Sequence, residues 1–510
     1  MTPSPSLDDF RQAYNAGRPQ LVWTRIVDDL ETPVSAYLKI ARGEPYAFLF
    51  ESVEGGAWRG RYSVVAMRPD LIWRCRGQKA EVSEGADLAA GRFRPEVEPA
   101  LDALRDLVAR SRMEMPKGLP PMSAGVFGAL GYDMVRLVER LPHVNPDPLD
   151  LPDAIMIRPS VVAIFDSIGQ EITLATTVRP AGEGADAAYA AAAERLEAVI
   201  ADLRRPLPPA PEREPAAPQP FESDVSRAAY GEIVERCKRY IEAGDIFQVV
   251  PSHRFHSPFP GQPFALYRSL RRLNPSPFMF FLNFGGFQLV GSSPEILVRL
   301  RDGKITIRPL AGTRPRGATP EEDAALEQEL RADPKERAEH LMLLDLGRND
   351  VGRVAMLRQA GANAPAEAAR GPNVRVTESF TIERYSHVMH IVSNVEGDAP
   401  EGVDPVDVLM AALPAGTLSG APKVRAMEII DEMEQVKRGI GYAGAVGYFG
   451  ADGSVDTCIV LRTALVKDEV MYVQAGGGVV ADSDPDAEYE ETLHKSRALR
   501  RAAEEAWRFD

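Results

Sequence analysis

Two glutamates, Glu339 and Glu491, have the residue type and the placement needed to bind a metal ion. Glu339 lies in DPKERAEHLMLLDLGRND, and Glu491 lies in DPDAEYEETLHKSRALRRAAEEAW. Both segments have helical spacing, and each glutamate falls on the inward stripe, where an unpaired carboxylate is costly. Two helices that each point a carboxylate inward favour Mg²⁺, which is usually held by one or two carboxylates plus the substrate. Solvated or salt-bridged glutamates are the alternative that spacing alone leaves open.

The residues around both glutamates predict how the two helices begin and which side chains share their inner faces. Asp333 can cap the first helix, Pro334 suits its first position, and Glu336 completes a capping-box pattern. In the second helix the residues that share one face are Glu488, Glu491, Lys495, Ala498 and Ala502.

Two glycine-containing segments follow predicted strands. In PLAGTRPRG, Thr313 offers a hydroxyl to an anion beside Arg314 and Arg316, although an ordinary basic turn has the same composition. In VQAGGGVVADSDP, the glycines 476–478 leave room for backbone N–H groups to face a ligand carboxylate. A strained bend at a sheet edge is the competing interpretation of the second segment.

The segment PAGTLSGAPKVRAMEIIDEME is not a phosphate-binding loop. Pro422 and the dipeptide Lys423-Val424 replace the residues that such a loop requires at its end. A nucleotide-binding function is therefore not predicted, and Thr417 and Ser419 remain as hydroxyl groups at the start of a helix.

Polar residues also interrupt two apolar strand patterns. His390, in RYSHVMHIVSNVEG, is expected on the strand face shared by Val388 and Val392, either as a hydrogen-bonded core residue or as an acid or base in a water-poor site. Arg462 lies in the apolar run CIVLRTALV after a predicted hairpin with a DG turn. It needs a carboxylate, which a structural ion pair or a bound ligand would supply.

Composition excludes several classes of function. The chain has 510 residues and a formal net charge of -15, which argues against a nucleic-acid or anionic-membrane surface. Three cysteines, far apart in sequence, make neither a disulfide framework nor a zinc pattern and fit a reducing cytoplasm. No signal peptide is evident, and apolar runs such as FMFFLNF are too short to span a bilayer.

The proline-rich segment 204–220 divides the chain. It separates an N-terminal region, 1–203, with strand signals such as YAFLFES and YSVVAM, from a catalytic region, 221–510, that alternates strands and helices. A helix that opens the second region is expected to end at Gly244. The pattern predicts a large α/β region of mixed sheet with outer helices, preceded by a smaller α+β region.

Taken together, these segments resemble the chorismate-utilising enzymes, most closely the large subunits (component I) of anthranilate synthases. The matching segments, in order from about 245 to 497, are GSSPEIL, PLAGTRPRG, DPKERAEHLMLLDLGRND, RYSHVMHIVSNVEG, GTLSGAPKVRAMEII, GYAGAVGYF, TCIVLRTALV, QAGGGVV and EYEETLHK. The resemblance implies a chorismate-utilising fold, a mixed two-sheet sandwich with helices outside. It also implies a Mg²⁺-dependent lyase that converts chorismate and ammonia to anthranilate and pyruvate, a step of tryptophan biosynthesis.

The same resemblance implies individual roles. Glu339 and Glu491 would be the Mg²⁺ ligands, with Glu488 behind them. Glu295 would assist departure of the ring hydroxyl, and His390 would serve the later proton abstraction. The other implied site residues are Thr417 next to His390, Gly312 and Thr313 under the ring, Tyr442 and Arg462 on the enolpyruvyl carboxylate, and Gly476, Gly477, Gly478 and Lys495 at the ring carboxylate.

Two positions discriminate within the family. Relatives that add water carry a lysine base where this chain has Gln248, and a neutral amide suits ammonia, which is already a nucleophile. Aminodeoxychorismate synthases, the nearest alternative, typically carry a lysine in place of Ala311. A third hypothesis, a catalytically silent subunit that senses tryptophan or chorismate, would show binding without turnover.

The resemblance further implies a partner and an inhibitor. No cysteine lies in a G-x-C-x-G elbow, so a separate glutamine amidotransferase subunit would supply ammonia within a hetero-oligomer. The expected effector is tryptophan, in a pocket between the N-terminal region and the large domain. The residues that match this pocket are Ser52, Pro277, Phe278 and Met279. Phe50, in FLFES, departs from the more usual LLES of the family.

Overall fold

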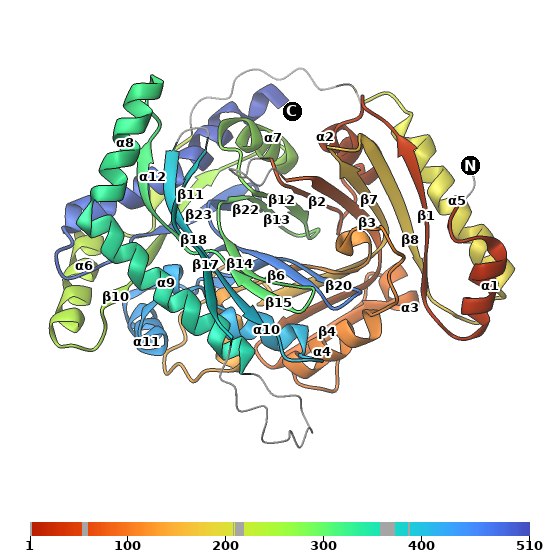
Figure 1. Cartoon of the computed structure of the whole chain (residues 1–510), viewed down its shortest axis with the longest axis horizontal. Coiled ribbons are helices and arrows are strands. Elements are labelled where there is room, and N and C mark those ends of the chain that lie inside the picture. Colours follow the sequence, from red (N-terminus) through yellow and green to blue (C-terminus); the bar gives the residue numbers. More distant parts are fainter. Residues whose placement is uncertain are drawn as a thin grey trace.

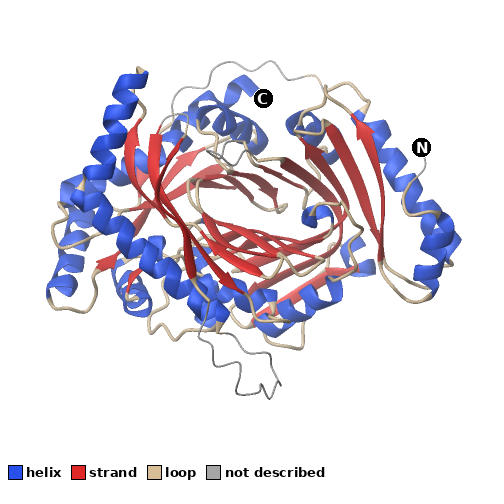
Figure 2. Ribbon diagram, viewed as in Figure 1, coloured by secondary structure: helices blue, strands red, loops and turns tan. Residues whose placement is uncertain are grey.

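In the computed structural model, strands fill the centre of the molecule and helices lie outside them (Figures 1 and 2). The α/β class with outer helices is thus confirmed. The described residues are 3–53, 60–207, 209, 219–356, 373–385 and 388–509. Most of the predicted linker 204–220 lies outside them. None of the described helices has both the length and the apolar content that a membrane span requires.

The first sheet begins in the C-terminal part of the chain and ends in the N-terminal part. Its strands, in spatial order, are β9 (Glu222–Ser223), β11 (Ser252–Pro258), β23 (Val470–Gly476), β22 (Thr463–Lys467), β13 (Gln288–Ser293), β12 (Phe278–Asn283), β2 (Phe48–Glu51), β3 (Tyr62–Arg76), β7 (Ala154–Asp166), β8 (Glu171–Val178) and β1 (Gln20–Val27).

The second sheet uses other parts of the same two long strands, β3 and β7. It runs through β5 (Arg94–Pro95), β4 (Lys79–Glu84), β3, β7, β6 (Gly125–Leu130), β20 (Ala445–Gly450), β21 (Val455–Ile459), β14 (Ile296–Arg301), β15 (Lys304–Ile307) and β18 (Val388–Asp398), which also pairs with β16 (Leu310–Pro315) and β17 (Arg375–Arg384).

The two sheets are joined where β3 and β7 bend. Their register shifts between Pro69 and Leu71, a position where a bulge accommodates proline because the ladder bond is already interrupted. The predicted two-sheet sandwich is therefore present, but hydrogen bonds connect its layers into one strand network. The sequence analysis also expects a mixed sheet, with parallel and antiparallel strands. All ladders between described strands are antiparallel instead.

Three apolar layers hold the sandwich together. The inner layer, between the sheets, contains Phe48 and Phe280 from the first sheet and Phe127 and Val446 from the second. The helices that cover the first sheet include α1 (Leu7–Asn15), α5 (Ala185–Leu203), α7 (Pro263–Leu273) and α12 (Pro485–Glu505). The second sheet is covered by α4 (Ala100–Ser111), α9 (Pro334–Ala355) and α10 (Pro405–Ala412). Truncating one such buried phenylalanine costs about 3–5 kcal/mol.

Helix boundaries follow the predicted signals at two places. The Asp333 side chain accepts hydrogen bonds from Lys335 N and Glu336 N, and Pro334 is the first residue of α9. The capping box is wrong in its second half, because the Glu336 carboxylate instead accepts from Arg314 Nη1 at 3.0 Å. Gly244, just after α6 (Arg227–Glu242), has the positive φ of 82° that ends a helix.

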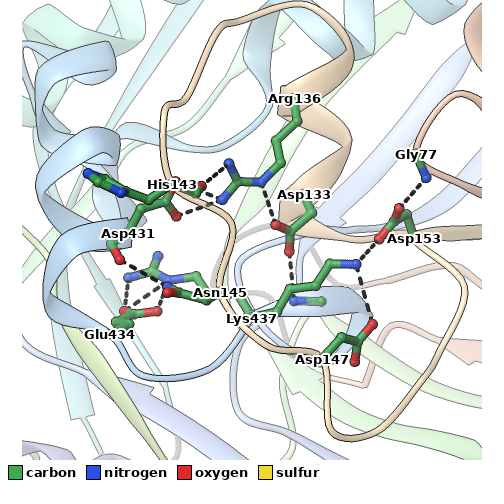
Figure 3. A network of polar contacts seen from close by, with 12 residues as sticks. Gly77, Asp133, Arg136, His143, Asn145, Asp147, Asp153, Asp431, Glu434 and Lys437 are labelled. Atoms are coloured by element: carbon green, nitrogen blue, oxygen red, sulfur yellow. Dashed lines mark hydrogen bonds and ion pairs between the residues drawn. The ribbon is translucent and has the colours of Figure 1, made fainter.

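A polar network joins the two halves of the chain (Figure 3). Arg136 Nη2 donates to both carboxylate oxygens of Asp431 at 2.7 Å, and its Nε donates to Asp133 at 2.9 Å. Lys437 pairs with Asp147 and Asp153. We call these six residues the joining network. Together with the shared strands they link 1–203 to 221–510, whose boundaries stay a prediction.

Candidate active site

Glu295 lies where the chain crosses from the first sheet to the second, between β13 and β14. Its side chain is buried, and the hydroxyl of Thr417, in the turn η5 (Gly416–Leu418), donates to Oε1 at 3.3 Å. Burial raises the pKa of Glu295 to about 8, although Thr417 and the nearby positive charge of Arg462 oppose that rise. The carboxyl group thus keeps its proton at neutral pH, as a general acid must.

His390 and Thr313 face each other on the antiparallel pair β18 and β16. His390 Nδ1 lies 2.9 Å from Thr313 Oγ1 and 3.2 Å from the carbonyl oxygen of Gly312. A carbonyl oxygen only accepts, so this contact favours a proton on Nδ1 and a free lone pair on Nε2. Burial, and then the charge of Arg462, lower the pKa of His390 to about 4. The imidazole is therefore neutral and can act as a base.

Arg462 lies in the second crossing between the sheets, from β21 to β22. The expectation that it continues a strand is wrong: β21 ends at Ile459, β22 begins at Thr463, and Arg462 has a φ of 46°. Burial lowers the pKa of its guanidinium group. Among the described residues no carboxylate lies within 4.0 Å of it, so the structural ion pair that the sequence left open is not formed there. The charge is available to an anionic ligand.

Tyr442 and the glycines 476–478 lie at the adjacent end of the first sheet. Burial raises the pKa of Tyr442, while a hydrogen bond with the Gly476 backbone opposes the rise. A Cβ on Gly477 would lie 2.5 Å from Glu488 Oε2, and one on Gly478 would lie 2.4 Å from Gln248 Nε2. A Cβ on Gly476 would lie 2.4 Å from the Pro251 carbonyl oxygen, so glycine is required at 476, whereas at 477 and 478 it lets the Glu488 and Gln248 side chains approach the backbone closely.

Three carboxylates from α9 and α12 converge at the end of this glycine segment. Burial, and then the charges of Glu336 and Glu491, raise the pKa of Glu339. Burial raises the pKa of Glu488, and Glu491 adds to that rise. Such mutual effects require the carboxylates to lie near one another. Because like charges repel, the group favours a cation at its centre.

The carboxylates are placed differently from the prediction in one respect. The Glu491 side chain is 47% exposed and forms an ion pair of 2.7 Å with Lys495, so it does not lie on a buried stripe. The Lys495 side chain is 45% exposed as well, so this face of α12 is open to solvent. Lys495 Nζ also donates to the Gly476 carbonyl oxygen at 2.8 Å. The sequence analysis expects the N–H groups of this segment to face a ligand, whereas this lysine binds a carbonyl oxygen of the segment.

A divalent cation fits these residues. Glu488 Oε1 accepts from Ser483 at 2.7 Å, but Oε2 is buried and has no hydrogen-bond partner within the described part of the chain. An orphaned carboxylate oxygen is costly unless a cation or a ligand satisfies it. No group of three or more His, Cys, Asp or Glu among the described residues is arranged to hold a metal. A site of one or two carboxylates completed by substrate is the form that Mg²⁺ commonly takes.

Gln248 lies at the back of the site on the short strand β10 (Gln248–Val249), which pairs with β19 (Gly420–Ala421). The side chain is buried, and Oε1 has no hydrogen-bond partner among the described residues. Ala311 is also buried, next to the Gly312 bulge of β16. Its methyl group stands where the alternative function would require a lysine. A neutral amide and a methyl group thus occupy the two positions that the sequence analysis expects to discriminate within the family.

The predicted effector residues line a separate cavity of about 500 Å³ between the two sheets. Strands β2 and β12 lie side by side here, with Met279 opposite Glu51. The lining includes all four predicted residues, namely Ser52, Pro277, Phe278 and Met279. Segments from both sides of the predicted linker thus meet at this cavity, which has the volume of a small-molecule site.

The structure adds residues that the sequence did not single out. The Tyr385 ring lies 5.6 Å from His390 in a T-shaped arrangement, and its hydroxyl donates to Glu383 Oε2 at 2.8 Å. Lys335, at the start of α9, lowers the pKa of both Glu339 and Glu488. Tyr385 lies in the same RYSHVMH segment as His390, and this closeness in sequence could have indicated that the two side chains are neighbours. No local pattern indicates that Lys335 faces α12.

This arrangement of acid, base, guanidinium and carboxylates on a two-sheet sandwich matches one family. The chain belongs to the chorismate binding enzyme family, whose model matches residues 68–501. It is 58% identical to the anthranilate synthase component 1 of Cereibacter sphaeroides over 99% of this chain and 98% of that protein. It is 47% identical to the same component of Pseudomonas putida, with 93% of each chain covered. The resemblance stated from the sequence is confirmed.

Solved structures agree on the fold. The anthranilate synthase component I of Streptococcus pneumoniae superposes with a TM-score of 0.74 at 34% identity, covering 88% of this chain and 93% of that one. The menaquinone-specific isochorismate synthase of Escherichia coli superposes with a TM-score of 0.69 at 19% identity and covers 98% of both chains, which shows the fold alone.

Proposed function

We propose that this chain is the large subunit of an anthranilate synthase, a Mg²⁺-dependent lyase that converts chorismate and ammonia to anthranilate and pyruvate. The observation that carries the proposal is Glu295, a buried carboxyl group that holds its proton at neutral pH beside Thr417. A departing ring hydroxyl needs a proton donor of this kind. The relatives of high identity named as anthranilate synthase component 1 support the same conclusion.

The proposed sequence of events uses each group where the fold places it. Arg462 and Tyr442 bind the enolpyruvyl carboxylate, and Glu295 protonates the leaving hydroxyl while ammonia adds to the ring. His390, held by Thr313, then takes a ring proton on Nε2 as pyruvate departs. Gln248 accommodates ammonia without activating water. Glu339 and Glu491 would hold Mg²⁺, which when bound supplies positive charge to the ring carboxylate.

The direct test is product identity. Purified protein, chorismate, Mg²⁺ and ammonium at high pH should yield fluorescent anthranilate. Accumulation of a 4-amino product would instead support an aminodeoxychorismate synthase component, which Ala311 argues against. Chorismate binding without any product would support the silent-subunit hypothesis and overturn the proposal.

The proposal extends to a partner and an inhibitor. A separate glutamine amidotransferase subunit would deliver ammonia, so glutamine should replace ammonium only when that subunit is added. Tryptophan would bind in the 500 Å³ cavity that Ser52 and Met279 line. Tryptophan should therefore inhibit the wild type, and Ser52→Phe should relieve inhibition while uninhibited kcat stays within about twofold. The reason is that Glu295, His390 and Arg462 do not line this cavity, although Tyr385, the neighbour of His390, does.

A further inference from the structure

Arg438 is a fully buried arginine whose donors end on separate segments of the chain. Its side chain is 1% exposed, and that of Glu434, four residues earlier and just after α11 (Lys423–Met433), is 3% exposed. Arg438 Nε donates to Glu434 Oε2 at 3.0 Å. Its Nη1 donates to the carbonyl of Leu418 at 2.7 Å, and its Nη2 donates to the carbonyl of Val250 at 2.6 Å.

Both carbonyls belong to segments that carry candidate catalytic side chains. Leu418 directly follows Thr417, the hydrogen-bond partner of Glu295. Val250 lies just beyond β10, which carries Gln248. The two segments touch through a bond from Val250 N to Ser419 O of 3.0 Å. Arg438 therefore bonds both to the segment that carries Thr417, the partner of Glu295, and to the segment that follows Gln248.

The same ion pair also reaches the substrate-binding end of the site. The Arg438 guanidinium carbon lies 5.3 Å from the centroid of the Tyr442 ring. Glu434 Oε1 accepts from Ser252 N at 2.8 Å and from Ser252 Oγ at 2.7 Å. Ser252 is the register partner of Gly476 on β23. Tyr442 and the glycine segment are thus positioned from the side that faces away from the substrate.

Stability alone does not account for such a pair. Removing two charges from water is expensive, and apolar residues of similar volume often stabilise a core as well or better. Only a planar guanidinium, however, can donate in fixed directions to two carbonyls and a carboxylate at once. Near Glu434 the joining network provides a contrast, because the Arg136 donors end on Asp133, Asp431 and a carbonyl outside the site (Figure 3).

We propose that Arg438, oriented by Glu434, is a positioning residue that fixes Gln248, Thr417 and Tyr442 relative to one another for catalysis. This inference rests on the proposed function. Arg438 contacts the site only from behind, so its effect is on alignment: small displacements of aligned groups lower a rate by about 100-fold. It does not contact Glu339 or Glu491, so the dependence of rate on Mg²⁺ concentration should not change.

The test compares the kcat of Arg438→Lys and Arg438→Met with that of the wild type in the ammonium assay. Circular dichroism gives the folded fraction of each protein, and kcat is expressed per folded molecule. We expect kcat to fall about 100-fold in Arg438→Met and about tenfold in Arg438→Lys, which retains the charge and part of the hydrogen bonding. The Mg²⁺ concentration for half-maximal rate should stay within twofold. Arg136→Met, the matched control, removes a largely buried arginine, 18% exposed, and the bonds from its Nη2 to both oxygens of Asp431 without touching the site, and should keep kcat within twofold.

Two further variants keep the inference falsifiable if Arg438→Met does not fold. Glu434→Gln preserves the shape of the pair and should lower kcat about tenfold at unchanged Mg²⁺ dependence. Arg438→Lys combined with Thr417→Val should lose less activity than the product of the two single losses, because both changes disturb one alignment.

The outcomes separate the inference from the proposed function. If the wild type makes no anthranilate, the proposed function fails and the inference fails with it. If the wild type is active and Arg438→Lys and Glu434→Gln match its kcat, or if Arg136→Met loses as much kcat as Arg438→Met, only the positioning role is overturned.

Discussion

Buried charges are handled differently in the joining network and in the candidate active site. In the joining network, Arg136 meets two carboxylates and Lys437 meets two more. In the site, Arg462 has no carboxylate within 4.0 Å among the described residues, and Glu488 Oε2 has no partner there either. The comparison indicates that the network stabilises the fold, whereas the site keeps binding capacity for a charged ligand.

The largest expected effect follows from removing one carboxylate of the site. Glu339→Gln should lower kcat about 1000-fold, because charge stabilisation by a bound cation contributes several kcal/mol. The free energy of unfolding should stay the same or rise, since repulsion from Glu336 and Glu491 is relieved. Anthranilate fluorescence and urea denaturation measure the two quantities.

Glu490→Gln is the matched control for that variant. Glu490 neighbours Glu491 on α12 but pairs with Arg227, away from the site. It should retain wild-type kcat. If the kcat of Glu339→Gln stayed within tenfold of the wild-type kcat, the metal assignment would be contradicted and the contrast between the two regions would weaken.

Two buried arginines sharpen the contrast further. Arg462→Met should raise the KM for chorismate about 100-fold, which corresponds to the loss of one charge-assisted contact, with little change in stability. Arg254, which pairs with Asp224 at 3.0 Å, should behave in the opposite way. Arg254→Met should lower the free energy of unfolding by about 2 kcal/mol and leave KM unchanged. Equal stability losses in both variants would refute the distinction.

Within the joining network a stability effect without a kinetic effect is expected. Asp431→Asn should lower the free energy of unfolding by about 2 kcal/mol, because Arg136 loses a buried bidentate partner. Asp345→Asn breaks an exposed pair with Arg348 and should change stability by less than about 0.5 kcal/mol. Both variants should retain kcat, and a large kcat loss in Asp431→Asn would show that the network also serves catalysis.

The last expected effect, the one measured without any kinetic assay, is a change in the pH dependence of stability. The pKa of Glu295 is raised to about 8, so the folded protein keeps a proton that the unfolded chain releases near pH 4.5. Since the unfolded chain binds fewer protons between these values, stability falls as pH rises from about 5 to about 8. Glu295→Gln has no titrating group at this position and should remove that fall, which a shift of this size sets at about 5 kcal/mol. Parallel pH profiles of unfolding in both proteins would contradict the raised pKa.

The parts of the molecule that local signals determine could be predicted from the sequence. Asp333 caps α9 because a side chain and two amides within three residues suffice to form the cap. The hairpin of β20 and β21 likewise follows from its DG turn. The resemblance to a known family supplied the fold and the candidate roles, which periodicity alone did not.

Features that depend on distant backbone could not be predicted. Arg438 stands in QVKRGIGY, and its partners are carbonyl oxygens, which every residue carries and which no sequence pattern marks. Arg462 looks like a strand residue until the chain is seen to cross between sheets at that point. The exposure of Glu491 depends on how α12 packs against its neighbours, a property of the assembled layers.

The bend shared by β3 and β7 has a consequence for how this architecture can change during evolution. Removing residues 1–203 would take away β2 and β6 and leave the flanks of β12 and β20 without neighbours, two freshly opened ladders prone to self-association. The N-terminal segment is therefore not a detachable accessory. Any lineage that modified the cavity between the sheets would have to do so by substitution along existing strands, keeping the sheets continuous throughout.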